Sequence, residues 1–192
     1  PYIELPDTRI QPRLSLGFGL RALALIASDK KLLRESQKLA RTLKPSLSEA
    51  EGKDLAERLR DKIPVIYSSA DNFAIAYNWK IKFNETAKIP AFYNLVPELN
   101  HNEMISFSES NESSKFCFIF LKDDIDNDRI KKRMAISEDL YKKLGLPVIK
   151  IDLQGKSKME KVFSSLIFAD WTSVYLGELY GHETEQIPMV EQ

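Results

Sequence analysis

Hydrophobic residues recur at helical spacing through the first third of the chain. Leucine and alanine return every three or four positions in residues 14–27, 29–43 and 48–62. This spacing places apolar side chains along one face of a helix. Ser48 and Glu51 stand at the start of the third run with the spacing of a capping box. The pattern therefore predicts three consecutive helices before the first strand.

After residue 62, short apolar runs alternate with longer helical patterns. The short runs predict strands at 63–67, 104–108, 116–121 and 147–152. The helical patterns fall at 71–83, 127–144 and 158–180, and residues 88–103 are predicted to be irregular. Strands that alternate with helices of this length indicate an α/β domain with a mostly parallel sheet. Within the first of these helices, we expect Phe73, Tyr77 and Trp79 to belong to the core.

The chain of 192 residues is expected to form one domain. Residues 1–13 form an extended entry segment, and residues 14–62 form the leading helices. Residues 63–180 form an alternating β/α core, and residues 181–192 form a polar tail that we expect to be cut short. A chain of this length buries a core without disulfide bonds.

The charge balance argues against two classes of partner. Lys plus Arg and Asp plus Glu both total 28, so the formal net charge is zero. Nucleic-acid binders and polybasic membrane anchors carry a basic surplus. No segment reaches the length of a membrane span, and no signal peptide of the usual form is present. We therefore expect a cytoplasmic protein that binds neither nucleic acid nor membrane.

Cysteine and histidine are too few for common cofactor sites. Cys117 is the only cysteine, and His101 and His182 are the only histidines. These counts exclude a disulfide within the chain and argue against a zinc site. The glycine-rich nucleotide loops, the zinc-binding helix motif and the serine elbow motif are absent. No metal and no cofactor are expected.

Candidate chemistry is concentrated in residues 79–104, which hold Glu85, Glu98, His101 and Glu103. Catalytic groups of α/β domains sit on loops at the carboxyl edge of the sheet. A carboxylate and a histidine from two such loops would form an acid/base pair.

Structural roles compete with this interpretation at each position. Glu85 could pair with a neighbouring lysine, and His101 could hydrogen-bond within its loop. Arg13, Lys80 and Lys82 would be surface residues, and Asp170 would be a structural hydrogen-bonding group.

Several motifs resemble one known family, namely Gln11-Pro-Arg-Leu-Ser-Leu-Gly-Phe18, Ile63-Pro-Val-Ile-Tyr67, Ala76-Tyr-Asn-Trp-Lys80, Phe83-Asn-Glu-Thr-Ala-Lys88, Pro97-Glu-Leu-Asn-His-Asn-Glu103 and Ala169-Asp-Trp-Thr-Ser-Val-Tyr-Leu176. They are similar to the C-terminal half of the bifunctional phosphoglucose/phosphomannose isomerases. Those proteins contain two sugar isomerase (SIS) domains. The resemblance implies a three-layer SIS domain, with a flavodoxin-like parallel sheet and helices on both faces.

The resemblance also implies an activity. The family interconverts aldose and ketose phosphates, here glucose 6-phosphate with fructose 6-phosphate and in addition mannose 6-phosphate. A glutamate and a histidine sixteen positions apart carry that reaction, as Glu85 and His101 are spaced here. Glu85 would move a proton between C2 and C1 through a cis-enediol. His101 would open the sugar ring from the partner subunit of a homodimer, and Arg13 would stabilise the enediolate. Thr184 would stand at the position linked to mannose phosphate.

Two departures from the family affect the expected activity. The N-terminal SIS domain, with the loop that grips the sugar phosphate, is missing from this chain. The family's C-terminal lysine has no counterpart, because no lysine follows Lys161. We therefore expect the isolated domain to be poorly active.

Two other functions remain open. One is a non-catalytic SIS domain that binds a phosphosugar as a regulatory ligand. The other is an interaction domain without a small-molecule site.

Overall fold

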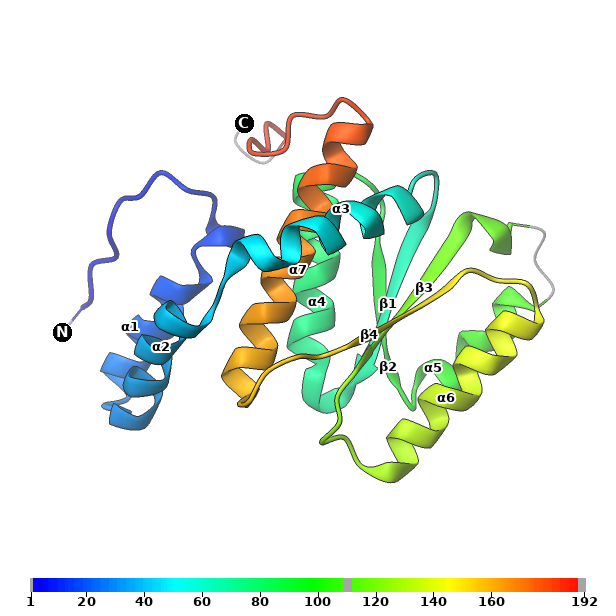
Figure 1. Cartoon of the computed structure of the whole chain (residues 1–192), viewed down its shortest axis with the longest axis horizontal. Coiled ribbons are helices and arrows are strands. Elements are labelled where there is room, and N and C mark those ends of the chain that lie inside the picture. Colours follow the sequence, from blue (N-terminus) through cyan, green and yellow to red (C-terminus); the bar gives the residue numbers. More distant parts are fainter. Residues whose placement is uncertain (1, 109–111, 190–192) are drawn as a thin grey trace.

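A computed structural model describes residues 2–108 and 112–189 (Figure 1). The helices are α1 (Leu16–Ile26), α2 (Lys30–Thr42), α3 (Glu49–Arg58), α4 (Phe73–Lys82), α5 (Leu99–Asn102), α6 (Asp128–Lys143) and α7 (Lys158–Leu179). The strands are β1 (Ile63–Ser69), β2 (Phe92–Val96), β3 (Phe116–Lys122) and β4 (Val148–Asp152).

The four strands form one parallel sheet in the order β2-β1-β3-β4. β1 and β3 lie in the centre, where Val65 is in register with Phe92 on one side and with Phe118 on the other. The two central strands are almost wholly buried, as expected for parallel strands covered on both faces. This arrangement confirms the predicted α/β class and the flavodoxin-like strand order.

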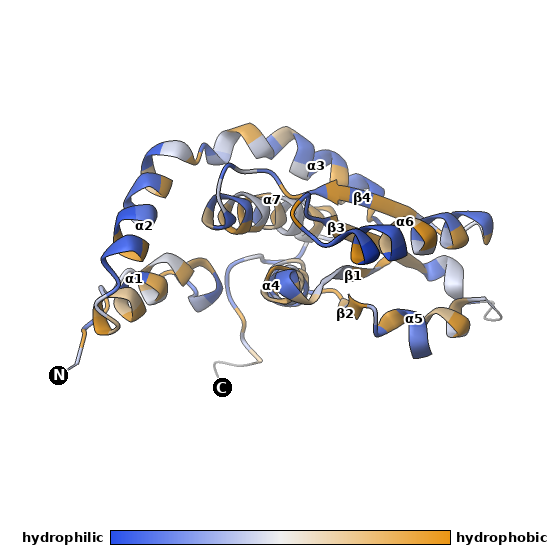
Figure 2. Ribbon diagram, turned by 90° about the horizontal axis from the view of Figure 1, so that it is seen from below, coloured by the Kyte–Doolittle hydropathy of each residue, from blue (hydrophilic) through white to orange (hydrophobic). Residues whose placement is uncertain are grey.

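Helices cover both faces of the sheet and create two cores. α4 and α7 lie on one face, and α5 and α6 on the other (Figure 2). The first core is centred on Trp79, Phe83 and Ile119, and the second on Tyr67, Phe118 and Tyr141. In the second core the rings of Phe118 and Tyr141 lie 4.4 Å apart. The three predicted layers are therefore present.

Three local predictions were wrong for reasons of tertiary context. Residues predicted to be irregular contain β2, which forms because Phe92–Val96 pairs with β1. The segment predicted as a strand at 104–108 is instead a 3₁₀ turn at Met104–Phe107. Ser48 makes no side-chain cap on α3, because the 3₁₀ turn Pro45–Ser48 leads directly into that helix.

The aromatic face of α4 was also assigned incorrectly. Trp79 is fully buried, but Phe73 and Tyr77 are 47% and 42% exposed. α4 turns Ile75, Trp79 and the following Phe83 inward. Tyr77 therefore lies at the flank of the helix, where its ring meets that of Tyr93 at 5.4 Å.

α1 and α2 pack on each other and stand beside the α/β body rather than within it (Figure 1). Among the described residues, ten of the twenty large hydrophobic side chains that stay exposed lie in residues 2–26. They include Phe18, Leu23 and Ile26. Contiguous exposed apolar surface of this kind is typical of interaction sites.

Gly52 permits the close approach of α3 to α7. A Cβ atom at this position would lie 2.6 Å from Trp171 Cβ and 3.1 Å from the main-chain nitrogen of Thr172. Neither neighbour can move independently of α7. In contrast, a Cβ at Gly17 would have nothing within 4 Å.

We expect Gly52→Ala to lower the free energy of unfolding by about 2 kcal/mol, because the added methyl group overpacks the interface between α3 and α7. Gly17→Ala is the matched control. It should raise the free energy of unfolding by about 0.5 kcal/mol, since alanine is the better helix former. Urea denaturation of both variants measures the two shifts, and shifts of the same sign would contradict this account of Gly52.

Candidate functional site

Arg13 is a buried arginine that ties together three distant segments. It lies in the 3₁₀ turn Pro12–Leu14 and is only 6% exposed. Its Nε donates to Thr86 Oγ1 at 2.8 Å, and its Nη2 donates to the carbonyl oxygens of Thr184 and Glu185 at 2.9 and 2.7 Å. The interpretation of Arg13 as a surface residue is therefore wrong, because these acceptors satisfy its charge inside the protein.

Glu85 lies beside the remaining nitrogen of that guanidinium. Its Oε2 is 3.6 Å from Arg13 Nη1, and its side chain is 37% exposed. Arg13 Nη1 is itself buried and has no hydrogen-bond partner within residues 2–108 and 112–189. A carboxylate that solvent can reach thus faces a fixed cation with an unused N–H donor.

A π-helical turn presents Glu85. The turn Phe83–Ala87 continues α4 and ends at Lys88, whose φ of 57° is left-handed. Turns of this type often occur at functional sites. α7 approaches the turn closely at Gly177, where a Cβ would lie 3.1 Å from the carbonyl oxygen of Thr86. Sequence periodicity does not reveal such a turn, although Gly177 within a long apolar helix was an available signal.

The C-terminal tail folds back over this turn. His182 Nδ1 lies 2.8 Å from the carbonyl oxygen of Ala87, and Lys88 Nζ donates to the carbonyl oxygen of Glu183. Hydrogen bonds from the main-chain N–H groups of Glu185 and Gln186 lower the pKa of Glu183. Thr184 thus reaches the site through its main-chain carbonyl oxygen on Arg13. The structure brings Arg13, Glu85 and Thr184 together.

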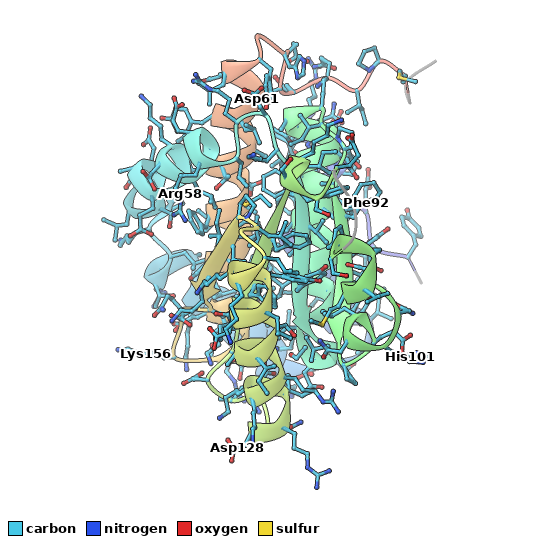
Figure 3. The ribbon with its side chains drawn as sticks, turned by 90° about the vertical axis from the view of Figure 1, so that its right-hand side faces the viewer. Arg58, Asp61, Phe92, His101, Asp128 and Lys156 are labelled. Atoms are coloured by element: carbon cyan, nitrogen blue, oxygen red, sulfur yellow. The ribbon has the colours of Figure 1, made fainter. Side chains whose placement is uncertain are left out.

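His101 lies at the other end of the sheet. Its side chain is 83% exposed and its Nδ1 is 3.7 Å from Glu98 Oε1. Figure 3 shows His101 at the outer surface, far along the molecule from Phe92, where β2 begins. The five residues of β2 span about 17 Å at the usual rise of a strand.

The expectation that Glu85 and His101 share the carboxyl edge of the sheet is wrong. α4 leaves the carboxyl end of β1 and returns to the amino end of β2, so Glu85 lies at the amino edge. His101 follows β2 and lies at the carboxyl edge. Within one chain the two side chains form no acid/base pair.

Glu103 has a structural environment. Its carboxylate accepts hydrogen bonds from the hydroxyl of Tyr67 and from Asn94 Nδ2, the latter at 2.5 Å. Burial raises the pKa of Tyr141, whose hydroxyl lies 3.3 Å from that of Tyr67, to about 12, so the Tyr141 hydroxyl stays neutral near pH 7. These contacts fix the segment that carries His101 against β1.

The carboxyl edge between β1 and β3 is where open α/β sheets generally bind ligands, because the chain leaves these two strands in opposite directions. Here that position is filled by charged groups of the chain. The side chain of Asp123 is fully buried, and it accepts hydrogen bonds from Lys161 Nζ at 2.5 Å and from Asn72 Nδ2 at 3.2 Å. Burial alone would raise the pKa of Asp123, but these hydrogen bonds and one from the N–H of Ile125 lower it to about 2.

Two grooves lie away from Arg13 and Glu85. A groove of about 710 Å³ follows the open edge of β4 between α3 and α7. It exists because no further strand covers that edge in the described part of the chain. A groove of about 430 Å³ at the carboxyl edge is bordered by Lys122, Lys131 and Lys161 together with Asp123 and Asp152. The first groove is therefore not part of the Arg13–Glu85 site, and its volume is no measure of that site.

Within the described residues, no helix has the length and apolar character needed to cross a membrane. No group of three or more histidine, cysteine, aspartate or glutamate side chains is arranged to hold a metal ion in residues 2–108 and 112–189.

Comparison with known proteins identifies first the class and then the family. A solved structure described as a glucose-6-phosphate isomerase like protein from Thermus thermophilus superposes with a TM-score of 0.69 at 19% identity, over 93% of this chain and 62% of that chain. The two proteins therefore share the same fold. The family described as the bacterial phospho-glucose isomerase C-terminal SIS domain matches residues 48–192, and the chain belongs to this family. The resemblance found in the motifs is confirmed.

Curated relatives are longer than this chain. A bifunctional phosphoglucose/phosphomannose isomerase from Aquifex aeolicus is 34% identical over 183 residues, which are 95% of this chain and 57% of that protein. The protein of the same name from Thermoplasma volcanium is 30% identical over 185 residues, again 95% of this chain and 59% of the relative. The chain thus spans less than two thirds of these proteins.

We expect Asp123→Asn to lower the free energy of unfolding by about 2 kcal/mol at pH 7, because the buried Lys161 loses its principal partner. The native pKa of Asp123 is below the ordinary 3.8, so its contribution is present above pH 4 and is lost as the pH falls toward 2. Thermal unfolding between pH 7 and pH 3 should show the two proteins converging. Asp124 also contacts Lys161 Nζ, but its side chain is 82% exposed. Asp124→Asn is therefore the control for an exposed partner of the same lysine and should change the free energy of unfolding much less. A difference that does not vary with pH would contradict this role of Asp123.

Proposed function

We propose that this chain is the C-terminal part of an aldose–ketose phosphosugar isomerase. Its substrates are glucose 6-phosphate and fructose 6-phosphate, and mannose 6-phosphate in addition. The observation that carries the proposal is the pairing of Glu85 with a buried guanidinium nitrogen of Arg13 that has no hydrogen-bond partner in the described part of the chain.

The two side chains suit a proton transfer at carbon. Glu85 takes the proton from C2 of the open-chain aldose and returns it to C1. Arg13 Nη1 donates to the oxygen that becomes negatively charged in the cis-enediol intermediate, and a fixed guanidinium stabilises such an oxyanion. The C1 carbonyl oxygen gains a proton as the C2 hydroxyl loses one, so the reaction needs no other reactant.

Ring opening would use His101 of a second copy. One chain holds His101 and Glu85 at opposite edges of the sheet, so a homodimer is required to bring them together. The exposure of His101 supports this role, because its side chain is open to a neighbouring molecule. Thr184 would contribute to substrate binding indirectly, because its carbonyl oxygen accepts a hydrogen bond from Arg13 and holds the guanidinium in place.

A preceding SIS domain would supply the grip on the sugar phosphate. Asp123 and Lys161 fill the usual ligand position of this domain's own sheet, so the phosphate needs another site. The exposed apolar side chains of residues 2–26 precede the matched family domain and would pack on that preceding domain. A cytoplasmic location is consistent with this metabolic role.

A regulatory phosphosugar-binding domain is the alternative. The groove at the carboxyl edge favours it, because Lys122 and Lys131 border the groove and would contact a phosphate there. In that case Glu85 would be dispensable.

A coupled assay with fructose 6-phosphate and mannose 6-phosphate tests the proposal. It is run on this chain alone and with the amino-terminal part of the Aquifex aeolicus relative supplied. Glu85→Gln should reduce the isomerisation rate by about 10²-fold or more, because the amide takes up no proton. Glu57→Gln, at a half-exposed surface glutamate, is the matched control. Absence of activity in a folded, reconstituted dimer would favour the regulatory alternative.

Mixing two inactive variants tests the shared site. Glu85→Gln and His101→Ala chains are mixed under the conditions in which the unmodified protein is active. If His101 acts from the second copy, half of the dimers regain one intact site, and about a quarter of the original rate returns. Mixing that restores no activity would show that the histidine is not supplied across the interface.

A further inference from the structure

Lys82 is a buried lysine whose ammonium group contacts two other segments. It lies at the end of α4, and its side chain is 2% exposed. Its Nζ is 2.5 Å from Asp170 Oδ1 on α7 and donates to the main-chain carbonyl oxygen of Arg13 at 3.4 Å. The interpretation of Lys82 as a solvated surface residue is therefore wrong.

Stability alone does not explain this ion pair. Lys82 is buried, while the side chain of Asp170 is 30% exposed. Such a pair loses part of its hydration, and apolar residues of similar size often serve stability equally well. Burial raises the pKa of Asp170, and the nearby Lys82 and Arg13 cations act in the opposite direction. The carboxylate is thus partly desolvated and lies beside two cations, an arrangement that packing alone does not require.

We propose that Lys82 and Asp170 are positioning residues for Arg13. Lys82 holds the main chain of Arg13 through its carbonyl oxygen, while Thr86 and the tail hold the guanidinium group. Asp170 keeps the ammonium group of Lys82 at that carbonyl.

The position of Lys82 connects the two halves of the site. It precedes Glu85 by three residues, at the point where α4 passes into the π-helical turn. The same end of α4 thus anchors the backbone of Arg13 and carries the carboxylate that Arg13 faces. Arginine side chains are long, and fixing only the guanidinium end would leave the backbone of the entry segment able to shift. An error of about 1 Å in such a geometry can reduce a rate by 10²-fold.

The first test measures the order of Arg13 in this chain, and it is independent of catalysis. The Nε–H of Arg13 is buried and hydrogen-bonded to Thr86, so its ¹⁵N–¹H signal should exchange slowly with water. Lys82→Met should speed this exchange by roughly tenfold, because local opening becomes easier. Lys82→Arg should preserve slow exchange. Lys80→Met is the matched control on the same helix and should leave the exchange unchanged.

A double variant keeps the test decisive if the single change impairs folding. Lys82→Met with Asp170→Leu replaces the ion pair by an apolar pair, which a protein interior tolerates. Circular dichroism establishes that the variant is folded. Faster exchange of the Arg13 signal in the folded double variant supports the positioning role. Exchange within twofold of the original protein would overturn it.

The kinetic consequence rests on the proposed isomerase function. In the reconstituted assay, the double variant should lower kcat by roughly tenfold or more while KM stays within about twofold, because Arg13 acts on the transition state. A tenfold rise in KM with kcat unchanged would overturn the positioning role. If the unmodified protein shows no isomerisation, the proposed function fails, and the exchange measurement still decides the role of Lys82.

Discussion

The hydrogen bonds of one buried guanidinium hold the candidate site together. Arg13 donates to a side chain 73 positions away and to carbonyl oxygens 171 and 172 positions away, so its burial requires the entry segment, the end of α4 and the tail to meet. The donors of a buried cation are in most cases hydrogen-bonded. The π-helical turn and the close approach at Gly177 both serve this meeting. Glu85 faces the one nitrogen that these segments leave without an acceptor within the described residues.

The charged groups at the two edges of the sheet differ in how fully they are hydrogen-bonded. At the carboxyl edge, Asp123 and Lys161 satisfy each other in a tight pair, with Asn72 as a further donor. At the amino edge, Arg13 and Glu85 stand 3.6 Å apart without a hydrogen bond between them, and the carboxylate is reachable from solvent. In the first arrangement the charges are paired by hydrogen bonds, and in the second one guanidinium N–H group has no acceptor within the described residues. This contrast is the reason why the proposed site lies at the amino edge and not at the usual ligand position.

The local pattern of apolar residues predicted most of the helices and strands. The predictions failed where contacts with residues distant in sequence determine the secondary structure. β3 was predictable because its apolar run is continuous. β2 was missed because it becomes a strand only by pairing with β1. The candidate site shows the same division: the motifs identified Glu85 and Arg13, but not the burial of Lys82. Periodicity places a lysine at a helix end in solvent, and only the packing of α7 against α4 shows that Asp170 meets it.

The sequence by itself determined the α/β class, the family and the candidate residues, since these depend on residue types and on their spacing along the chain. The tertiary structure alone decided which of the candidates meet. Glu85 and His101 are sixteen positions apart, yet the direction of α4 and β2 sends them to opposite edges of the sheet. Arg13 and Thr184 are far apart in sequence, yet they are in hydrogen-bond contact. Spacing along a chain does not specify such contacts, because they depend on how the elements between the residues turn and pack.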